Sequence, residues 1–194
     1  MDGTALLGGF TDAARQSAEA FRTALDCMAR PGRIGRLAGA VPPEGASPAA
    51  ATLLLVLADA DTPVWLPPRL AGGAVAEWLR FHAGAPLVTE PETACFALGR
   101  WEELAPLEAW PAGEPAYPDR GATLILEAEA LEGGPQWRLT GPGIAGETAF
   151  APVLPEGAAG ALRRNAARFP LGLDLFLASG ACIAALPRTT RIGG

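Results

Sequence analysis

Positions 186–191, with the sequence LPRTTR, bring two arginines and two threonines together near the end of the chain. In an extended segment, Arg188 and Thr190 project to one side and Thr189 to the other. An arginine fork beside a hydroxyl group suits a phosphate or a carboxylate, so one interpretation is an anion-binding corner. The other interpretation is the ordinary polar end of a buried strand. Side-chain chemistry alone favours this second interpretation.

The only histidine, His82, is the one obvious side chain that titrates near neutral pH. It follows Arg80 and Phe81 near the predicted end of a helix, where a cation interacts favourably with the helix dipole. The sequence contains no G-x-S-x-G nucleophile motif that would pair with it. A catalytic role for His82 is therefore the less favoured interpretation.

Two pairs of carboxylates are spaced so that they could act together. Asp59 and Asp61 could hold a metal, but beside a Thr-Pro step such residues more often bond to the backbone of a turn. Glu127 and Glu129 share one side of a predicted strand, as an acid/base pair would. The solvated side of a sheet gives the same pattern, and we expect that simpler arrangement.

The segment GPGIAG at positions 141–146 matches the glycine pattern of dinucleotide-binding loops. Such a site needs a helix beginning at the loop, so that its amide groups face the pyrophosphate. Here Pro142 removes one amide, and Pro152 follows too soon for a long helix. We therefore predict a rigid Gly-Pro-Gly turn.

All fifteen basic residues are arginine. Without lysine there is no Schiff-base chemistry, no pyridoxal phosphate held as an internal aldimine and no phosphate-loop lysine. The three cysteines, Cys27, Cys95 and Cys182, are far apart among apolar neighbours, which predicts buried free thiols. Together with one histidine they do not form a zinc pattern. We expect neither a cofactor nor a metal.

The formal charge of −6 argues against nonspecific nucleic-acid binding, which needs a basic surface. The longest apolar helical segment, at positions 46–58, is too short to span a bilayer. The first ten residues have neither a basic leader nor an adequate apolar stretch for a signal peptide. We therefore expect a cytoplasmic protein without a membrane segment.

Four segments have the pattern of helices: positions 11–28, 47–58, 73–82 and 157–168. Thr11 is the predicted cap of the first helix, and Ser47 followed by Pro48 begins the second. Apolar residues recur along the first helix at steps of three and four, which predicts its buried stripe. This stripe consists of Ala14, Ala18, Phe21, Leu25 and Met28.

Short strands are predicted between these helices, at positions 64–66, 95–98 and 123–131. Positions 136–140 are expected to pair with the last of these across Gly133 and Gly134. Positions 173–178 and 181–186 form either a hairpin or one bulged strand. Positions 101–110 are predicted to be a short amphipathic helix. The alternation predicts one α/β domain over residues 1–194, with a central mixed sheet flanked by helices.

Six motifs, in order and over nearly the whole chain, resemble the PhnH family of bacterial carbon–phosphorus lyase subunits. They are AFRTALDCMARPGRIGRL, LLLVLADADTPVWL, WLRFHAGAP, YPDRGATLIL, LTGPGI, and FPLGLDL followed by ALPRTT. The resemblance implies a reduced version of the fold of pyridoxal-phosphate-dependent transferases, without the cofactor. It also implies a homodimer and a core complex with the G, I and J subunits.

In that system, the resemblance implies, phosphonate displaces adenine from ATP to give a ribose 1-phosphonate 5-triphosphate. A radical iron–sulfur subunit later cleaves the carbon–phosphorus bond. Our leading hypothesis is a subunit of this ribose 1-methylphosphonate 5-triphosphate synthase that supports assembly and has no turnover of its own. A second hypothesis is a phosphate-ligand site, and a third is a stand-alone hydrolase or transferase that uses His82. The residues expected to bind a ligand or a partner are Arg22, Arg30, His82, Arg120, Arg188, Thr189 and Thr190.

Overall fold

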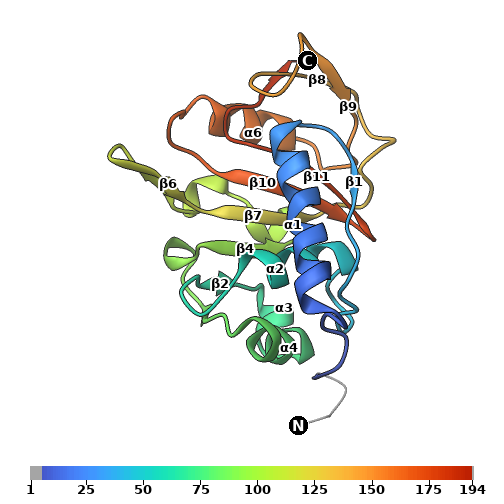
Figure 1. Ribbon diagram of the computed structural model, residues 1–194. Helices are drawn as coiled ribbons and strands as arrows, with labels where there is room; N and C mark the ends of the chain where they lie inside the picture. Colours follow the sequence, from blue (N-terminus) through green and yellow to red (C-terminus); the bar gives the residue numbers. More distant parts are fainter. Residues whose placement is uncertain (1–5, 194) are drawn as a thin grey trace.

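A seven-stranded mixed sheet runs through the centre of the protein, whose computed structural model describes residues 6–193. Its strands, in order across the sheet, are β1 (Gly35–Arg36), β11 (Cys182–Leu186), β10 (Asp174–Ser179), β7 (Thr123–Glu127), β4 (Phe96–Gly99), β2 (Val64–Trp65) and β3 (Leu87–Val88). The five strands from β10 to β3 are parallel, while β11 is antiparallel to both of its neighbours. The predicted α/β class is confirmed (Figure 1).

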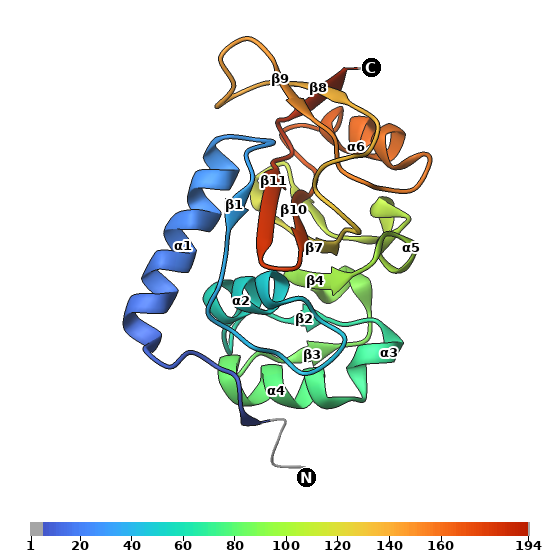
Figure 2. The ribbon, with the colours of Figure 1, turned by 90° about the vertical axis from the view of Figure 1, so that its right-hand side faces the viewer.

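Helices cover both faces of this sheet. One face packs against α1 (Ala13–Ala29), α2 (Pro48–Leu57), α3 (Pro68–Ala71) and α4 (Ala74–Ala83). The other packs against α5 (Trp101–Leu104), η3 (Leu107–Ala109) and α6 (Ala158–Ala166). Figure 2 shows α1 and α2 on one side of the sheet and α5 and α6 on the other. Side chains alternate along each strand, so Ile125 of β7 enters the first core while Leu124 and Leu126 enter the second. A short helix η2 (Pro91–Thr93) precedes β4.

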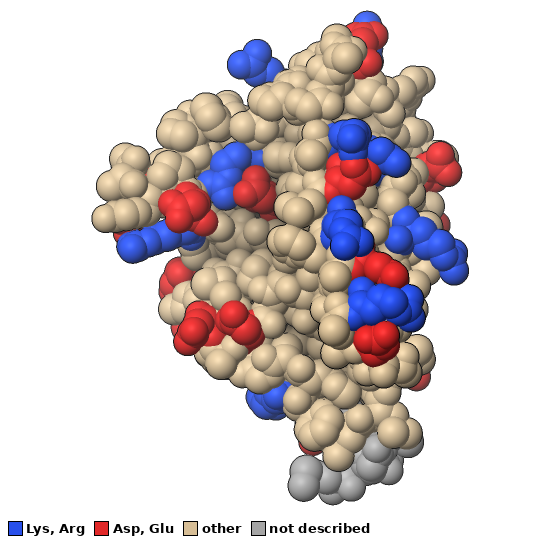
Figure 3. Space-filling view, viewed as in Figure 1, with Lys and Arg blue, Asp and Glu red and all other residues tan. Residues whose placement is uncertain are grey.

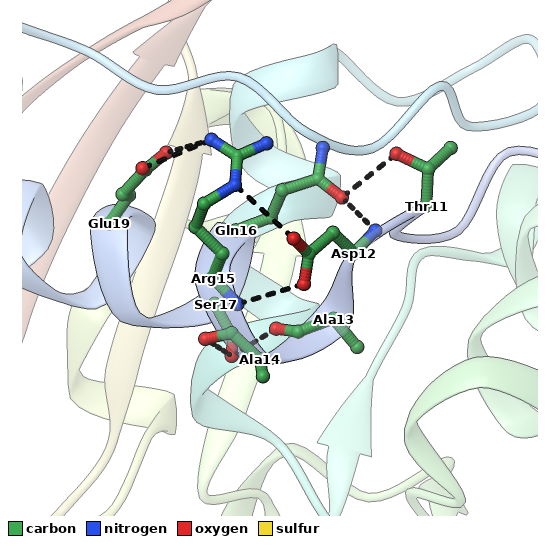
Figure 4. A network of polar contacts seen from close by, with 8 residues as sticks. All are labelled: Thr11, Asp12, Ala13, Ala14, Arg15, Gln16, Ser17 and Glu19. Atoms are coloured by element: carbon green, nitrogen blue, oxygen red, sulfur yellow. Dashed lines mark hydrogen bonds and ion pairs between the residues drawn. The ribbon is translucent and has the colours of Figure 1, made fainter.

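Polar residues around its first turn fix the start of α1 (Figure 4). The N-cap is Asp12, whose Oδ1 accepts the amide of Arg15 at 3.3 Å; the predicted cap, Thr11, instead donates to Gln16 at 3.2 Å. Arg15 also contacts Glu19 one turn further on, at 3.2 Å. The predicted helix is confirmed, and its cap lies one residue later than expected.

The predicted buried stripe of α1 is wrong except at Met28, which is partly buried against the core. The buried residues are Ala20, Ala24 and Cys27, whereas Phe21 and Leu25 are 45% and 53% exposed. Small residues allow the helix to approach the sheet closely. A Cβ atom added to Gly35 of β1 would lie 2.8 Å from the Cys27 sulfur. The helix therefore packs mainly through its small residues, and Phe21 and Leu25 remain on the surface.

Two small sheets complete the fold. One has the order β12 (Arg191–Gly193), β8 (Trp137–Thr140) and β9 (Thr148–Phe150), and the other pairs β5 (Ala112–Glu114) with β6 (Tyr117–Gly121). The predicted pairing of 136–140 with 123–131 is wrong, because β7 is flanked by β4 and β10. The predicted helix over 101–110 is interrupted at Pro106, between α5 and η3. The hairpin of β10 and β11 is confirmed. Within residues 6–193, no helix is long and apolar enough to cross a membrane.

The GPGIAG segment forms a turn between β8 and β9, as predicted. Gly143 adopts φ +81°, and a Cβ atom there would lie 2.0 Å from the Ala29 carbonyl oxygen at the end of α1. The absence of a side chain at this position therefore permits a close contact between two backbones.

Replacing Gly143 with alanine is expected to lower the free energy of unfolding by about 2–4 kcal/mol, since positive φ and a backbone clash add together. Gly146→Ala is the matched control, because Gly146 has φ +79° and open space around a Cβ atom. It should cost about 1 kcal/mol. Urea denaturation of the two variants measures the difference, and equal losses would contradict the close contact.

Candidate functional site

The LPRTTR segment forms a turn between β11 and β12 and is not extended. The amide of Thr190 donates to the Pro187 carbonyl at 2.8 Å, which closes the turn. Thr190 is 4% exposed and its hydroxyl has no hydrogen-bond partner among the described residues. Thr189 is half-buried, and its carbonyl oxygen lies 2.8 Å from where a Cβ atom of Gly141 would be. Thr190 therefore lies inside the fold, and the expectation that it projects beside Arg188 is wrong.

Arg188 connects three strands. Its Nη2 lies 2.6 Å from Oδ2 of Asp174, and its Nε donates to the same carboxylate at 3.2 Å. Its Nη1 donates to the carbonyl of Pro118 in β6, and its backbone amide donates to Asp174 Oδ1 at 2.8 Å. The side chain is only 11% exposed. This geometry favours the interpretation of a braced strand end over an open anion-binding corner.

His82 lies in α4 among apolar and aromatic groups. Its ring centroid is 5.1 Å from that of Trp78 and 4.9 Å from that of Phe81. A Cβ atom added to Gly9 would lie 2.4 Å from the imidazole, so the N-terminal segment covers the ring closely. Its Nε2 is buried without a hydrogen-bond partner in the described part of the chain. These contacts describe a packing residue.

Arg120 lies on β6, in the hairpin that projects from the body of the protein in Figure 1. Its guanidinium carbon is 4.1 Å from the centroid of the Tyr117 ring, a cation–π distance. Both residues are exposed. The stacking leaves the guanidinium hydrogens accessible, so Arg120 is available to an acidic group.

A groove beside α1 brings together two of the predicted residues, Arg22 and Arg30. It has a volume of about 750 Å³, and its charged lining residues are Arg22, Arg30, Arg33, Arg36 and Asp26. Asp26 pairs with Arg30, and with Arg33 at 3.0 Å. Neither Arg22 nor Arg36 forms an ion pair within residues 6–193. In Figure 3, basic side chains lie over α1 and β1 with acidic side chains between them.

Leu25, one of the apolar residues that the helical period singled out, lines this groove. Phe21 and Leu25 are neighbours on the exposed side of α1, one turn apart, and Ala14 and Ala18 extend the same stripe toward its N-terminus. An apolar stripe bordered by arginines is typical of a surface that another molecule covers. We call Ala14, Ala18, Phe21 and Leu25, with Arg22, Arg30, Arg33 and Arg36, the α1 surface.

The cysteines and the Asp59–Asp61 pair were expected to be buried free thiols and a turn, respectively. The three cysteines are free, but only Cys27 is buried, and burial raises the pKa of its thiol; Cys95 is exposed. Asp59 forms the expected turn, accepting the Asp61 amide at 3.0 Å. The described residues contain no group of three or more His, Cys, Asp or Glu side chains that could hold a metal ion.

Glu127 was expected on the solvated side of a strand, and that expectation is wrong. Its carboxylate is partly buried and accepts the amide of Ser47, the N-cap of α2, at 2.7 Å. Burial raises its pKa, and the hydrogen bonds from Ser47 oppose that shift. Glu129, two residues on, is exposed. The sequence offers no signal for this difference, because Ser47 reaches Glu127 only through the tertiary fold.

A second carboxylate, that of Glu103, joins α3 to the start of α5. Glu103 of α5 binds Nε and Nη2 of Arg69 at 2.7 and 3.0 Å and accepts the amide of Arg100 at 2.8 Å. Burial by itself would raise the pKa of Glu103, but the hydrogen bonds from Arg69 and from the Arg100 amide outweigh it and lower the pKa below the ordinary 4.5. The charged form therefore stabilises the fold.

We expect Glu103→Gln to lower the free energy of unfolding by about 1 kcal/mol at pH 7. Because the folded pKa lies below the unfolded one, this stabilisation is complete above pH 4.5 and is lost as the pH falls through the folded value. Urea denaturation of both proteins across the acid range measures it. Glu102→Gln, at an exposed neighbour, should not change the profile. A constant difference between Glu103→Gln and wild type at every pH would contradict this account.

The chain is similar to proteins of bacterial phosphonate metabolism. The family model described as bacterial phosphonate metabolism protein (PhnH) matches residues 8–193. The chain is 39% identical, over 95% of its length and 94% of the relative's, to the alpha-D-ribose 1-methylphosphonate 5-triphosphate synthase subunit PhnH of Rhizobium meliloti (strain 1021). It is also 34% identical to the putative C-P lyase subunit protein HtxG of Stutzerimonas stutzeri, over 89% of this chain and 84% of the relative.

Proposed function

The chain belongs to the PhnH family, and we propose that it is the subunit through which a carbon–phosphorus lyase complex is assembled for phosphonate breakdown. In this role it supports formation of ribose 1-methylphosphonate 5-triphosphate and has no turnover of its own. The names of its relatives support membership of such a complex, since both are described as subunits.

The α1 surface is the observation that carries the assembly role. A surface helix of a monomeric protein normally turns its largest apolar residues toward the core. In contrast, α1 buries alanines and a cysteine and leaves Phe21 and Leu25 about half exposed. Covering two such side chains contributes roughly 1–2 kcal/mol each to an association, and the flanking arginines select an acidic partner surface. The helix therefore has one side that stabilises the chain and another that is available to a partner.

We place the chain in the cytoplasm, as a homodimer that joins the G, I and J subunits. We also propose that the fold is a reduced form of the pyridoxal-phosphate-dependent transferase fold that uses no cofactor.

A second candidate function is the binding of a phosphate-bearing ligand within the complex. Arg22 and Arg36 support it, because both line the α1 groove without an ion-pair partner among the described residues. Arg30 lines the same groove beside Asp26. Arg120 is accessible on its hairpin, whereas Arg188, Thr190 and His82 are already engaged in packing or ion pairing.

Co-expression with the G, I and J subunits, followed by size exclusion, tests the assembly role. We expect the chain to co-elute with them, and the complex without it to lose synthase activity. The purified chain incubated alone with ATP and methylphosphonate should yield no product. Turnover by the isolated chain, or a complex that is active without it, would contradict the proposal. Loss of ligand affinity in Arg22→Ala, with assembly intact, would support the second candidate function.

A further inference from the structure

A cleft of about 800 Å³ opens at the carboxyl ends of the parallel strands, separate from the α1 groove. Glu127 ends β7 there, and Arg100 and Trp101 follow β4 directly. The loop before α2, Arg69 of α3 and the segment after β9 supply the remaining walls. In open α/β sheets, ligands bind in the crevice outside the carboxyl ends of the strands. The position of this cleft thus matches a common ligand site.

The charges of the lining argue against a polyanionic ligand. Four carboxylates line the cleft, those of Glu44, Glu102, Glu127 and Glu129, against the guanidinium groups of Arg69 and Arg100. Arg69 is neutralised by its two hydrogen bonds to Glu103 and also donates to the Gly45 carbonyl at 3.1 Å. Of these two arginines, Arg100 is the one that forms no ion pair with another described residue. A triphosphate would meet more negative than positive charge here.

Glu127 is the most buried of these four acids and is held in place. Its Oε1 accepts the Ser47 amide at 2.7 Å, and Ser47 is its only hydrogen-bond partner within residues 6–193. A carboxylate has about four acceptor positions, so most of those on Glu127 remain available. A fixed carboxylate with open acceptor positions suits a ligand that brings hydroxyl or N–H donors. Its partial burial strengthens such bonds, since less water competes for them.

Trp101 supplies the apolar part of the lining. Its side chain is half-buried at the first position of α5, where the neighbouring Glu102 is exposed. Indole rings give flat apolar contact to other rings at little cost in side-chain entropy. An aromatic wall with a few fixed polar groups is typical of small-molecule sites. Carboxylates that accept from ribose hydroxyls are one recurrent form of this chemistry.

We propose that this cleft binds an uncharged ring carrying vicinal hydroxyl groups, with the hydroxyls donating to Glu127 and the ring lying against Trp101. A free pentose and a nucleoside share this chemistry. Arg100, an exposed residue of the lining, can donate to a ring oxygen of the ligand. This cleft is separate from the α1 surface, so ligand binding here does not depend on assembly with other subunits.

Calorimetric titration and saturation-transfer NMR with the full chain test the proposal, using ribose, adenosine, 2′,3′-dideoxyadenosine and ATP as probes. We expect adenosine or ribose to bind, dideoxyadenosine to bind at least about tenfold more weakly, and ATP to bind no better than adenosine. Equal binding of ribose and adenosine identifies a sugar site, and binding of adenosine alone identifies a nucleoside site. Failure of both to bind, or tighter binding of ATP, overturns the proposal.

Variants locate the site. Glu127→Gln keeps an oxygen for the Ser47 amide but removes the charge, so affinity should fall about tenfold or more while the fold is retained. Trp101→Ala should also weaken binding. Glu92→Gln, at an exposed carboxylate outside the cleft lining, is the matched control and should bind as wild type does. Unchanged affinity in Glu127→Gln would overturn the assignment, and the comparison of probes on the wild-type chain tests the proposal even if a variant does not fold.

Discussion

Replacing Phe21 and Leu25 together by aspartate is expected to abolish co-elution with the partner subunits while leaving the folded chain intact. Both side chains are already about half exposed, so folding of the chain loses little apolar burial. Association loses that burial and must also desolvate two carboxylates, which should weaken it at least about a hundredfold. Size exclusion of the co-expressed subunits and thermal unfolding of the single chain measure the two effects.

Conservative substitution provides the control for that experiment. Phe21→Leu with Leu25→Met keeps the α1 surface apolar and should preserve co-elution. A double-aspartate variant that still co-elutes would place the contact elsewhere on the protein. One that no longer folds would show that this side of α1 contributes to the core, contrary to its exposure.

Arg188→Ala is expected to lower the free energy of unfolding by about 3 kcal/mol. The change leaves the Asp174 carboxylate, 26% exposed, without its guanidinium partner and leaves the Pro118 carbonyl without its donor. Losing one partner of a buried ion pair typically costs about 3–5 kcal/mol, and partial exposure of Asp174 places the effect at the lower end. Urea denaturation measures it, and the double variant with Asp174→Ala should lose less than the sum of the two single losses.

Arg191→Ala is the matched control for Arg188→Ala. Arg191 is exposed and forms no ion pair among the described residues, so its loss should change stability by less than about 0.5 kcal/mol. If Arg188→Ala retained full stability but the complex lost phosphonate activity, the LPRTTR segment would be an anion-binding corner after all. A large loss of stability instead identifies it as the brace of three strands.

Local patterns determined much of the fold. The continuous apolar runs in Thr123–Glu127 and Asp174–Ser179 indicate strands buried on both faces, and their side chains do enter two different cores. The turn at Ser179 and Gly180 and the caps before α2 depend on residues a few positions apart, so the sequence contains all their information. The six short motifs that indicated the family are likewise local, since each one is a continuous segment of the sequence.

Only the tertiary structure decided which surfaces are buried and which polar groups meet. The sequence of α1 has a stripe of large apolar residues and another of small ones, and the approach of Gly35 to Cys27 selects the small stripe for the core. Likewise, Asp174 and Arg188 lie 14 positions apart, and Ser47 and Glu127 lie 80 apart. Whether such groups meet depends on how the strands are ordered across the sheet, which no local pattern encodes. Short stretches of the sequence therefore specify the helices, the strands and the family motifs. Which surfaces stay exposed to partners or ligands depends on packing between residues far apart in the sequence.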